Sequence, residues 1–199
     1  MKKIAVLTSG GDAPGMNACL RSVVRSALTY GIEVVGVLRG YKGLIEDEFI
    51  NISSKGVGNI LQVGGTVLLT SRCPEFETKS GQQKAILNLK KHGVEGLVVI
   101  GGDGSYHGAQ VLEQAGFKVA CIPGTIDNDL FYTDFTLGFD TAVNTITSLV
   151  NNIRDTAMSH ERPSVIEVMG AGCGDIALAV GCACGAEIIL VPEVKVTFN

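Results

Sequence analysis

Short apolar runs alternate with longer segments of helical periodicity along most of the chain. Five of the runs are short, end close to glycine or proline and are predicted to be strands: residues 4–8, 33–38, 67–69, 96–100 and 118–122. Three segments with helical spacing of apolar residues are predicted to be helices: residues 16–30, 80–92 and 105–115. Residues 40–43 are expected to form a loop. Strands that alternate with helices indicate parallel β-α-β units with right-handed crossovers, so the fold class is expected to be α/β.

The alternation continues beyond residue 138. The predicted elements there are a helix at 141–157, a strand at 164–169, a glycine turn at 170–174, a further helix and a strand at 187–191. We therefore expect residues 1–138 to form a three-layer α/β/α Rossmann-like domain with a mostly parallel sheet, itself incomplete. Residues 139–199 are expected to be the truncated start of a similar domain, because too few elements follow to cover a second sheet on both faces.

The composition indicates a folded protein that attracts anions locally rather than over its whole surface. The 199 residues are 46% hydrophobic and 18% charged, which supplies a sizeable core and argues against disorder. The net charge of −4 gives no broad basic field, so nucleic acid is not expected as a partner. No apolar stretch reaches membrane-spanning length, and the run after the N-terminal lysines is too short for a signal peptide.

The six cysteines are scattered among small or apolar neighbours, which favours reduced thiols and a cytoplasmic location. A zinc site built from Cys173, Cys182 and Cys184 stays a minor alternative, because neither a C-x-x-C pair nor a histidine accompanies these residues.

The segment Gly-Gly-Asp-Gly-Ser at residues 101–105 carries the strongest chemical signal in the chain. It follows a predicted strand and opens a predicted helix, so glycines let the backbone approach a ligand and free N–H groups point toward it. Such a helix start favours phosphate. Asp103 would repel a bare phosphate, so its presence indicates a divalent cation between the carboxylate and the phosphate oxygens, and magnesium fits best. We expect a magnesium–nucleotide site here.

Two further polar segments follow predicted strands. The turn at residues 9–15 is neither the dinucleotide fingerprint nor a P-loop, yet Gly11 is able to offer an amide to a phosphate. Arg72 lies just past a strand end, where a guanidinium can pair bidentately with phosphate, although a plain surface arginine is an equal interpretation. Ligands of parallel sheets bind beyond the carboxyl ends of the strands, so we expect one site to gather these segments.

The loop at residues 123–129 reads Pro-Gly-Thr-Ile-Asp-Asn-Asp and is the richest in chemistry. Asp127 and Asp129 are able to divide the work of phosphoryl transfer, one holding a metal and the other taking a proton from a hydroxyl. The alternative is a turn-forming cluster of Asp and Asn side chains without a catalytic role.

With these loops in hand, the sequence resembles the ATP-dependent 6-phosphofructokinases of the bacterial type, from Met1 to about Pro192. The match rests on several motifs in the order and spacing of that family: Leu-Thr-Ser-Gly-Gly-Asp at 7–12, Arg-Cys-Pro-Glu-Phe at 72–76, Gly-Gly-Asp-Gly-Ser at 101–105, Pro-Gly-Thr-Ile-Asp-Asn-Asp at 123–129, Ser-His-Glu-Arg at 159–162 and Glu-Val-Met-Gly at 167–170. The resemblance implies phosphorylation of fructose 6-phosphate by ATP to fructose 1,6-bisphosphate, a step of glycolysis.

The resemblance also implies roles for individual residues. Those that would contact ATP are Gly11, Tyr41, Arg72, Cys73, Gly102, Asp103, Gly104 and Ser105, and Asp103 would hold Mg²⁺. Those that would meet the sugar phosphate are Thr125, Ile126, Asp127, Arg162, Met169, Gly170 and Ala171. Within this set Asp127 would take the proton from the 1-hydroxyl, with Thr125 and Asp129 as further catalytic residues.

Oligomerisation and regulation are implied in the same way. Arg162 would reach into the sugar-phosphate site of a neighbouring subunit, which implies a homotetramer. An effector site for ADP or phosphoenolpyruvate would be formed by Arg21, Arg25, Asn59, Arg154, Gly185 and Glu187. Taken alone, Arg21 and Arg25 lie four residues apart on one helix face, where a solvated surface is the simpler interpretation.

Two features of the chain bear on activity. Gly104 and Gly124 stand where the pyrophosphate-using branch of the family carries Asp and Lys, so ATP is expected as the donor. Ala171 stands where the family carries an arginine, and losing one charged transition-state contact costs roughly a hundredfold in rate. The open alternatives are a kinase for another small hydroxyl compound and a nucleotide-binding regulatory or inactive fragment.

Overall fold

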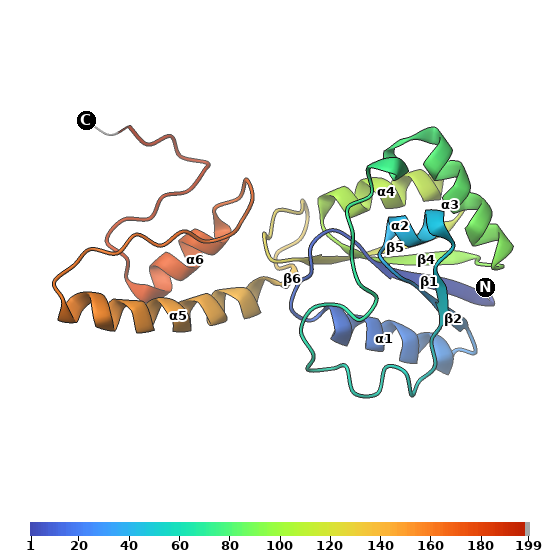
Figure 1. Cartoon of the computed structure of the whole chain (residues 1–199), viewed down its shortest axis with the longest axis horizontal. Coiled ribbons are helices and arrows are strands. Elements are labelled where there is room, and N and C mark those ends of the chain that lie inside the picture. Colours follow the sequence, from blue (N-terminus) through green and yellow to red (C-terminus); the bar gives the residue numbers. More distant parts are fainter. Residues whose placement is uncertain (198–199) are drawn as a thin grey trace. The chain divides into compact units, whose positions relative to one another are not determined.

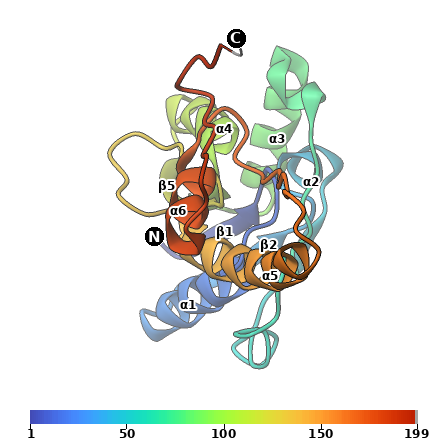
Figure 2. The ribbon, with the colours of Figure 1, turned by 90° about the vertical axis from the view of Figure 1, so that its left-hand side faces the viewer.

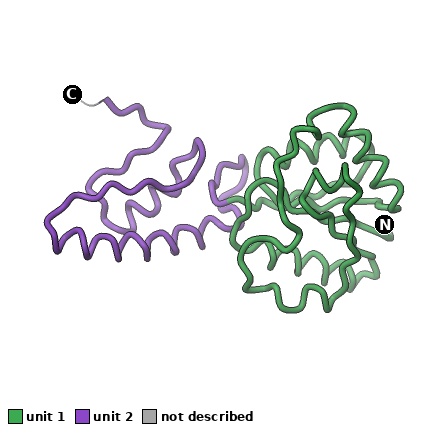
Figure 3. The backbone as a smooth tube through the Cα atoms, viewed as in Figure 1, with its two compact units in different colours: residues 1–125 green, residues 126–199 purple. Residues whose placement is uncertain are grey.

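The structure is a computed structural model that describes residues 1–197. The chain divides into two compact units, Met1–Thr125 and Ile126–Asn199 (Figure 3). The division therefore falls earlier than the predicted domain boundary after residue 138. Residues 198 and 199, with which the predicted second domain ends, lie outside the described residues.

The first unit is an α/β unit with a mostly parallel sheet, as predicted. Its elements are β1 (Lys3–Thr8), α1 (Met16–Thr29), β2 (Glu33–Val37), α2 (Tyr41–Glu46), β3 (Phe49–Asn51), the short 3₁₀ helix η1 (Pro74–Glu77), α3 (Lys79–Lys91), β4 (Gly96–Gly101), α4 (Asp103–Gln114) and β5 (Lys118–Thr125). These five strands lie in the order β3-β2-β1-β4-β5. All neighbours run parallel except β2 and β3, which pair antiparallel.

Helices cover both faces of this sheet, because the strands are apolar on both sides. Figure 1 shows α1 on one face and α2, α3 and α4 on the other. Ala5 and Leu7 of β1 point into the core under the three helices. The alternate residues Ile4 and Val6 point to the opposite face of the sheet and are buried as well. The sheet thus forms the middle layer. Because helices cover both of its faces, the loops that follow the strands are the expected place for a ligand.

The structure corrects three local predictions in this unit. Residues 67–69 form a turn rather than a strand, because Leu69 has a φ of 60° and its N–H donates to the Thr66 carbonyl at 3.1 Å. Residues 40–43 are not a loop: Tyr41 begins α2 directly after Gly40. β3 was not predicted, since three residues of an antiparallel edge strand carry too little pattern.

The second unit contains β6 (Leu137–Gly138), α5 (Phe139–Ser159) and α6 (Asp175–Cys184). The two helices pack together (Figure 2), and Phe139 of α5 belongs to the same apolar cluster as Ile176 and Val180 of α6. The predicted helix at 141–157 is confirmed, but the predicted strands at 164–169 and 187–191 do not form. Val165 is fully exposed there, and an apolar run without a neighbour to pair with gains nothing from a strand conformation. No helix of the described residues is long and apolar enough to cross a membrane.

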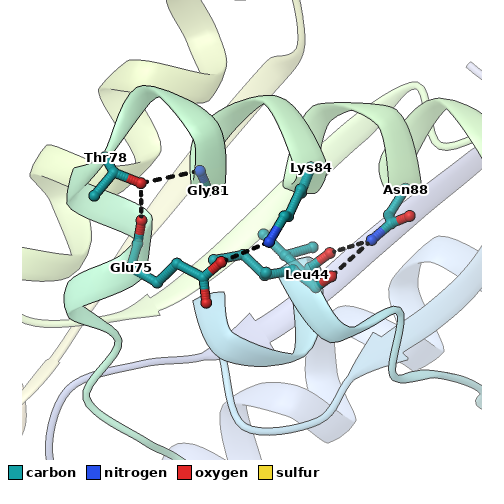
Figure 4. A network of polar contacts seen from close by, with 7 residues as sticks. Leu44, Glu75, Thr78, Gly81, Lys84 and Asn88 are labelled. Carbon is teal, nitrogen blue, oxygen red and sulfur yellow. Dashed lines mark hydrogen bonds and ion pairs between the residues drawn. The ribbon is translucent and has the colours of Figure 1, made fainter.

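A polar network connects α3 to α2 and to η1 (Figure 4). Thr78 caps α3, since its hydroxyl accepts from the Gly81 N–H at 3.1 Å and donates to the Glu75 carbonyl at 2.7 Å. Two turns beyond Gly81, Asn88 donates its amide to the Leu44 carbonyl at 2.9 Å, near the C-terminal end of α2. These bonds hold α2, which carries Tyr41, against the body of the unit.

Gly81→Ala is expected to destabilise the protein by about 2 kcal/mol, although alanine is the better helix former by about 1 kcal/mol. A Cβ at position 81 would overlap the Glu75 carbonyl oxygen, which Thr78 already holds in place. Gly104→Ala in the first turn of α4 is the matched control, because its Cβ would meet nothing within 4 Å. Urea unfolding of both variants checks this. Equal stability changes in the two would show that the overlap at position 81 is absent.

Candidate functional site

The ends of β1 and β4 approach each other closely, and glycine makes that approach possible. A Cβ at Gly101 would lie 2.5 Å from both the Ser105 Oγ and the Ser9 carbonyl oxygen. The Ser9 N–H donates to the Ile100 carbonyl at 3.0 Å, which ties the turn after β1 to the end of β4. A Cβ at Gly10, in that turn, would meet the same Ser105 Oγ at 3.5 Å. The two glycine turns predicted to bind phosphate therefore lie side by side.

The second of these turns leads into the N-terminus of α4 without a side-chain cap. Gly102 is the N-cap residue, and as a glycine it has no side chain to accept from the first amides of the helix. α4 begins at Asp103, two residues earlier than predicted, so Asp103 and Gly104 form its exposed first turn. An uncapped helix start attracts anions through its amides and its dipole. This arrangement suits a phosphate group.

The Asp103 side chain is 65% exposed and lies at this helix start. Its Oδ2 lies 3.4 Å from Nε2 of His107, one turn along α4. A carboxylate at an amide-rich turn is an oxygen ligand of the kind that Mg²⁺ prefers, and its exposure leaves room for the waters that Mg²⁺ retains. The residues present therefore fit the predicted metal.

Thr125 lies at the end of β5, beside the same helix start. A Cβ at Gly102 would meet the Thr125 Cβ at 3.5 Å. β5 extends to Thr125, beyond the predicted end of this strand at residue 122. Residues from the ends of β1, β4 and β5 thus come together, as expected for a site at the carboxyl edge of a parallel sheet.

Tyr41 is placed beneath α4 rather than at its surface. It is 6% exposed, its ring stacks on Phe76 at 4.3 Å, and its hydroxyl donates to the Ser105 carbonyl at 2.5 Å. Burial raises the pKa of Tyr41 well above its ordinary value, so the hydroxyl stays neutral. A Cβ at Gly108 would lie 2.5 Å from this ring. Tyr41 supports the first turn of α4, and its predicted contact with a nucleotide stays a prediction.

The loop that carries Arg72 is attached to the turn after β1. The Thr70 hydroxyl donates to the Gly10 carbonyl at 2.6 Å. Arg72 itself is exposed and forms no ion pair with any described residue, and Cys73 is half-buried against the core. Sequence reasoning missed Thr70, because its bond spans sixty positions and leaves no local pattern. Gly11 is exposed in the same turn as Gly10, to which the loop that carries Arg72 is attached.

The acidic loop that follows β5 belongs to the second unit. Asp127 and Ile126 are half-buried and Asp129 is exposed. Burial raises the pKa of the Asp127 carboxyl, and the nearby charge of Asp129 raises it further. A raised pKa makes this carboxylate a stronger base than an ordinary aspartate, as proton abstraction requires.

Asn128, between the two carboxylates, organises this loop. Its φ is 56°, a left-handed conformation that asparagine tolerates. Its amide donates to Asp175 Oδ2 at 2.8 Å, and its Oδ1 accepts from the Thr136 N–H at 2.9 Å. The alternative of a turn-forming cluster therefore describes Asn128 correctly, and it leaves the roles of Asp127 and Asp129 open.

The other residues predicted to meet a sugar phosphate lie in the second unit in exposed turns. Arg162 follows α5, where its N–H donates to the Ala157 carbonyl at 3.0 Å and its side chain is exposed. Met169 and Ala171 are also exposed and flank the buried Gly170. Ala171 has a φ of 53°, which is unusual for alanine. The predicted contacts of Arg162, Met169, Gly170 and Ala171 with the sugar phosphate stay predictions.

The six residues predicted to bind an effector are divided equally between the two units. In the first, Arg25 and Asn59 are exposed, and the Nε of Arg21 is buried without a hydrogen-bond partner among the described residues. The other three are Arg154, Gly185 and Glu187. Arg154 donates to the Cys184 carbonyl, directly before Gly185, which ends α6 with a φ of 67°, and Glu187 is exposed.

The alternative zinc site gains no support. Among residues 1–197, no group of three or more His, Cys, Asp or Glu side chains is placed to hold a metal ion. All six cysteines are free, and Cys184 is buried at the end of α6.

Comparison with known proteins gives one consistent result. A family model described as Phosphofructokinase matches residues 3–199. The chain is 59% identical over 194 residues to an ATP-dependent 6-phosphofructokinase of Paenibacillus macquariensis, covering 98% of this chain and 60% of the relative. It is 58% identical to the protein of that name from Clostridium botulinum strain Hall, covering 97% of this chain and 60% of the relative.

A solved structure of phosphofructokinase from Saccharomyces cerevisiae is similar with a TM-score of 0.90 and 39% identity, over 97% of this chain and 29% of that chain. The α/β fold is thereby confirmed. The chain spans about 60% of the length of the curated relatives that it matches.

Proposed function

The chain belongs to the phosphofructokinase family, and from that membership we propose that it transfers the γ-phosphoryl group of ATP to the 1-hydroxyl of fructose 6-phosphate. The products are fructose 1,6-bisphosphate and ADP, in the cytoplasmic pathway of glycolysis. The observation that carries the proposal is the uncapped start of α4, where Gly102 and Gly104 flank the exposed carboxylate of Asp103 beside the turn after β1. The free thiols are consistent with a reducing compartment.

In this proposal the first unit binds the nucleotide. Amides of Gly11 and of the α4 start receive the phosphates, Arg72 pairs with one of them, and Ser105 anchors the turn from inside. Asp103 holds Mg²⁺, which when bound neutralises charge on the phosphate oxygens. The hydrogen bond from the buried Tyr41 hydroxyl to the Ser105 carbonyl supports this nucleotide site, because it keeps the start of α4 in place.

The acidic loop would supply the base. Asp127 takes the proton of the 1-hydroxyl while the hydroxyl oxygen attacks the γ-phosphorus of ATP. The bond from that phosphorus to the bridging oxygen of ADP breaks as the new bond forms. The raised pKa of Asp127 supports this role, because the carboxylate is then a better proton acceptor. Thr125 and Asp129 flank the base in the chain, and Ile126, Arg162, Met169 and Gly170 are proposed to hold the sugar phosphate.

The two glycines at positions 104 and 124 support ATP as the donor. A Cβ at Gly124 would lie 2.9 Å from Ile100 Cγ2 and 3.3 Å from Met16 Cε, so a side chain there forces the core to shift. Position 104 has open space around it. A nucleotide phosphate is therefore able to approach the helix start without meeting a side chain.

Assembly and regulation extend the proposal. We place a homotetramer contact at Arg162 and an effector site for ADP or phosphoenolpyruvate at Arg21, Arg25, Asn59, Arg154, Gly185 and Glu187. The Nε of Arg21 is buried and has no hydrogen-bond partner among the described residues, which supports an anion partner for that side chain, since a buried guanidinium N–H is costly to leave unpaired.

A nucleotide-binding protein with little turnover is the second candidate. Ala171 favours it, because this exposed alanine occupies the position at which the family places an arginine. The two candidates share the nucleotide site and differ in whether ADP release depends on the sugar phosphate.

Asp103→Asn is expected to remove most of the gain in ATP affinity that Mg²⁺ gives, a loss of about tenfold, because a neutral amide is a weaker ligand for a divalent cation. Calorimetric titration of ATP with and without Mg²⁺ measures this. Asp140→Asn is the matched control, since Asp140 is also an exposed aspartate in the first turn of a helix, α5. An ATP affinity that Mg²⁺ raises equally in both variants would exclude Asp103 as the metal ligand.

A further inference from the structure

We propose that Asn17 is a positioning residue of the nucleotide site: its side-chain amide fastens the loop at residues 63–72 to the start of α1 and thereby places Arg72. The proposal rests on the proposed function for the identity of the ligand, a nucleotide phosphate. It concerns a residue that makes no contact with that ligand and acts through the backbone of a distant loop.

The Asn17 side chain uses its hydrogen-bonding groups on this loop. Its Nδ2 donates to the carbonyls of Val63 at 2.8 Å and Gly64 at 3.2 Å, and its Oδ1 accepts from the Val67 N–H at 2.8 Å. Asn17 is 1% exposed, so water does not compete for these bonds. Because both amide donors and the carbonyl oxygen are engaged, asparagine suits this position by its chemistry.

This use of Asn17 is unexpected for a residue at a helix start. Asparagine in the first turn commonly serves the free amides of its own helix. Here the N-cap residue of α1 is Gly15, with a φ of 90°, and no side chain caps the helix. The amide of Asn17 is directed to a loop more than forty residues away instead.

The loop itself has no regular secondary structure to hold its shape. Gly65 and Leu69 both have positive φ values, 67° and 60°. Its later part is attached by other bonds: the Thr8 hydroxyl donates to the Leu69 carbonyl at 2.9 Å, and the Arg39 N–H donates to the Leu68 carbonyl at 2.8 Å. Asn17 holds its first part at residues 63, 64 and 67, together with the Thr8 hydroxyl, which lies 2.8 Å from the Thr66 hydroxyl.

The loop at residues 63–72 is also bonded to the turn after β1, which is proposed to bind phosphate. Thr70 donates to the Gly10 carbonyl at 2.6 Å, and Arg72 follows two residues later with an exposed side chain. A guanidinium gains most from a phosphate when its backbone is already ordered, because binding then costs less conformational entropy. Loosening the loop at Asn17 therefore weakens the contribution of Arg72 without touching Arg72.

The test uses Asn17→Ala, with Thr70→Val as a milder second variant that keeps the side-chain shape. The first readout is trypsin cleavage after Arg72 under native conditions. The second is the affinity for ADP, measured with and without an added Arg72→Ala change. Ala27→Gly in α1 is the control, because it lowers helix stability at a buried position away from the loop.

Asn17→Ala is expected to speed cleavage after Arg72 about tenfold and to weaken ADP binding about tenfold, with a smaller effect in the same direction from Thr70→Val. Arg72→Ala should then cost far less affinity in the Asn17→Ala background than in the unmodified chain. Ala27→Gly should leave both the ADP affinity and the effect of Arg72→Ala unchanged.

Faster cleavage with an unchanged effect of Arg72→Ala would overturn the positioning role. Unchanged cleavage in Asn17→Ala would overturn the fastening itself. Absence of ADP binding by the unmodified chain would reject the proposed nucleotide site, and the positioning role with it. The cleavage rates would still decide whether Asn17 fastens the loop, so the two failures are distinguishable.

Discussion

Gly104→Asp is expected to weaken ATP binding by about two orders of magnitude and to leave the fold intact. Position 104 is exposed in the first turn of α4, and a Cβ there would meet nothing within 4 Å, so the new side chain fits. Its carboxylate would face the phosphate that the helix start is proposed to bind. Two like charges about 5 Å apart repel by roughly 3 kcal/mol at an effective dielectric constant of about 20, which corresponds to about two orders of magnitude.

Calorimetric titration of Mg²⁺–ATP measures this effect, and two variants at the same position separate charge from shape. Gly104→Asn has the shape of aspartate without its charge, and Gly104→Ala adds only a methyl group. Both should bind ATP within a few-fold of the unmodified chain. If asparagine weakens binding as much as aspartate does, steric blocking rather than charge is responsible and no phosphate lies close to position 104. Thermal unfolding should confirm that all three variants remain folded.

The parallel sheet could be predicted from sequence because its strands are buried on both faces. β1 and β4 contain continuous apolar runs, at residues 4–7 and 97–100, that are followed within three residues by glycine, a local signal that does not depend on the rest of the chain. The apolar runs at 164–169 and 187–191 gave the same signal and form no strand. A strand needs a neighbour to pair with, and a sequence pattern contains no information on whether that neighbour is present.

The glycine turns of the candidate site could be predicted for a similar reason. Residues 101–105 follow a strand and begin a helix, and both relations are local. The supports of the site could not be predicted. The bond from Tyr41 to Ser105 spans 64 positions, and those from Asn17 reach across 46 to 50. Such contacts form because strands that are distant in the sequence, such as β1 and β4, are neighbours in the sheet. A local sequence pattern does not show which strands are neighbours.

Hydrogen bonds within the fold also change the interpretation of two residues that the sequence singles out. Tyr41 matched a nucleotide-binding position by resemblance, yet its hydroxyl is held by the Ser105 carbonyl. Arg154 matched an effector position, and its guanidinium donates to the Cys184 carbonyl at the end of α6. In both cases the structure assigns the side chain a structural partner. The Tyr41 hydroxyl has donated its single proton to Ser105, whereas the Arg154 guanidinium has further N–H donors with which to contact a ligand.

Asp127→Asn is expected to lower the sugar-dependent release of ADP from Mg²⁺–ATP by about a hundredfold to ten-thousandfold, the range over which general base catalysis contributes. The amide has nearly the shape of the carboxylate but does not accept the proton of the 1-hydroxyl. ADP affinity should not change, because the proposed nucleotide residues all lie in the first unit, before Asp127 in the chain. A coupled assay of ADP formation with and without fructose 6-phosphate measures the loss.

The pH dependence of that activity gives a second, independent check on the base. Asp127 acts when ionised, and burial together with Asp129 raises its pKa, so activity should fall with decreasing pH at a higher pH than an ordinary aspartate with a pKa of 3.8 would give. Asp129→Asn is the matched control: it keeps the base, removes the neighbouring charge and should move this fall to lower pH.

If Asp127→Asn retains activity, another group takes the proton. If the unmodified chain releases no ADP in response to the sugar, the proposed turnover is contradicted for this chain, and the titrations of the Gly104 variants then test the nucleotide site by itself.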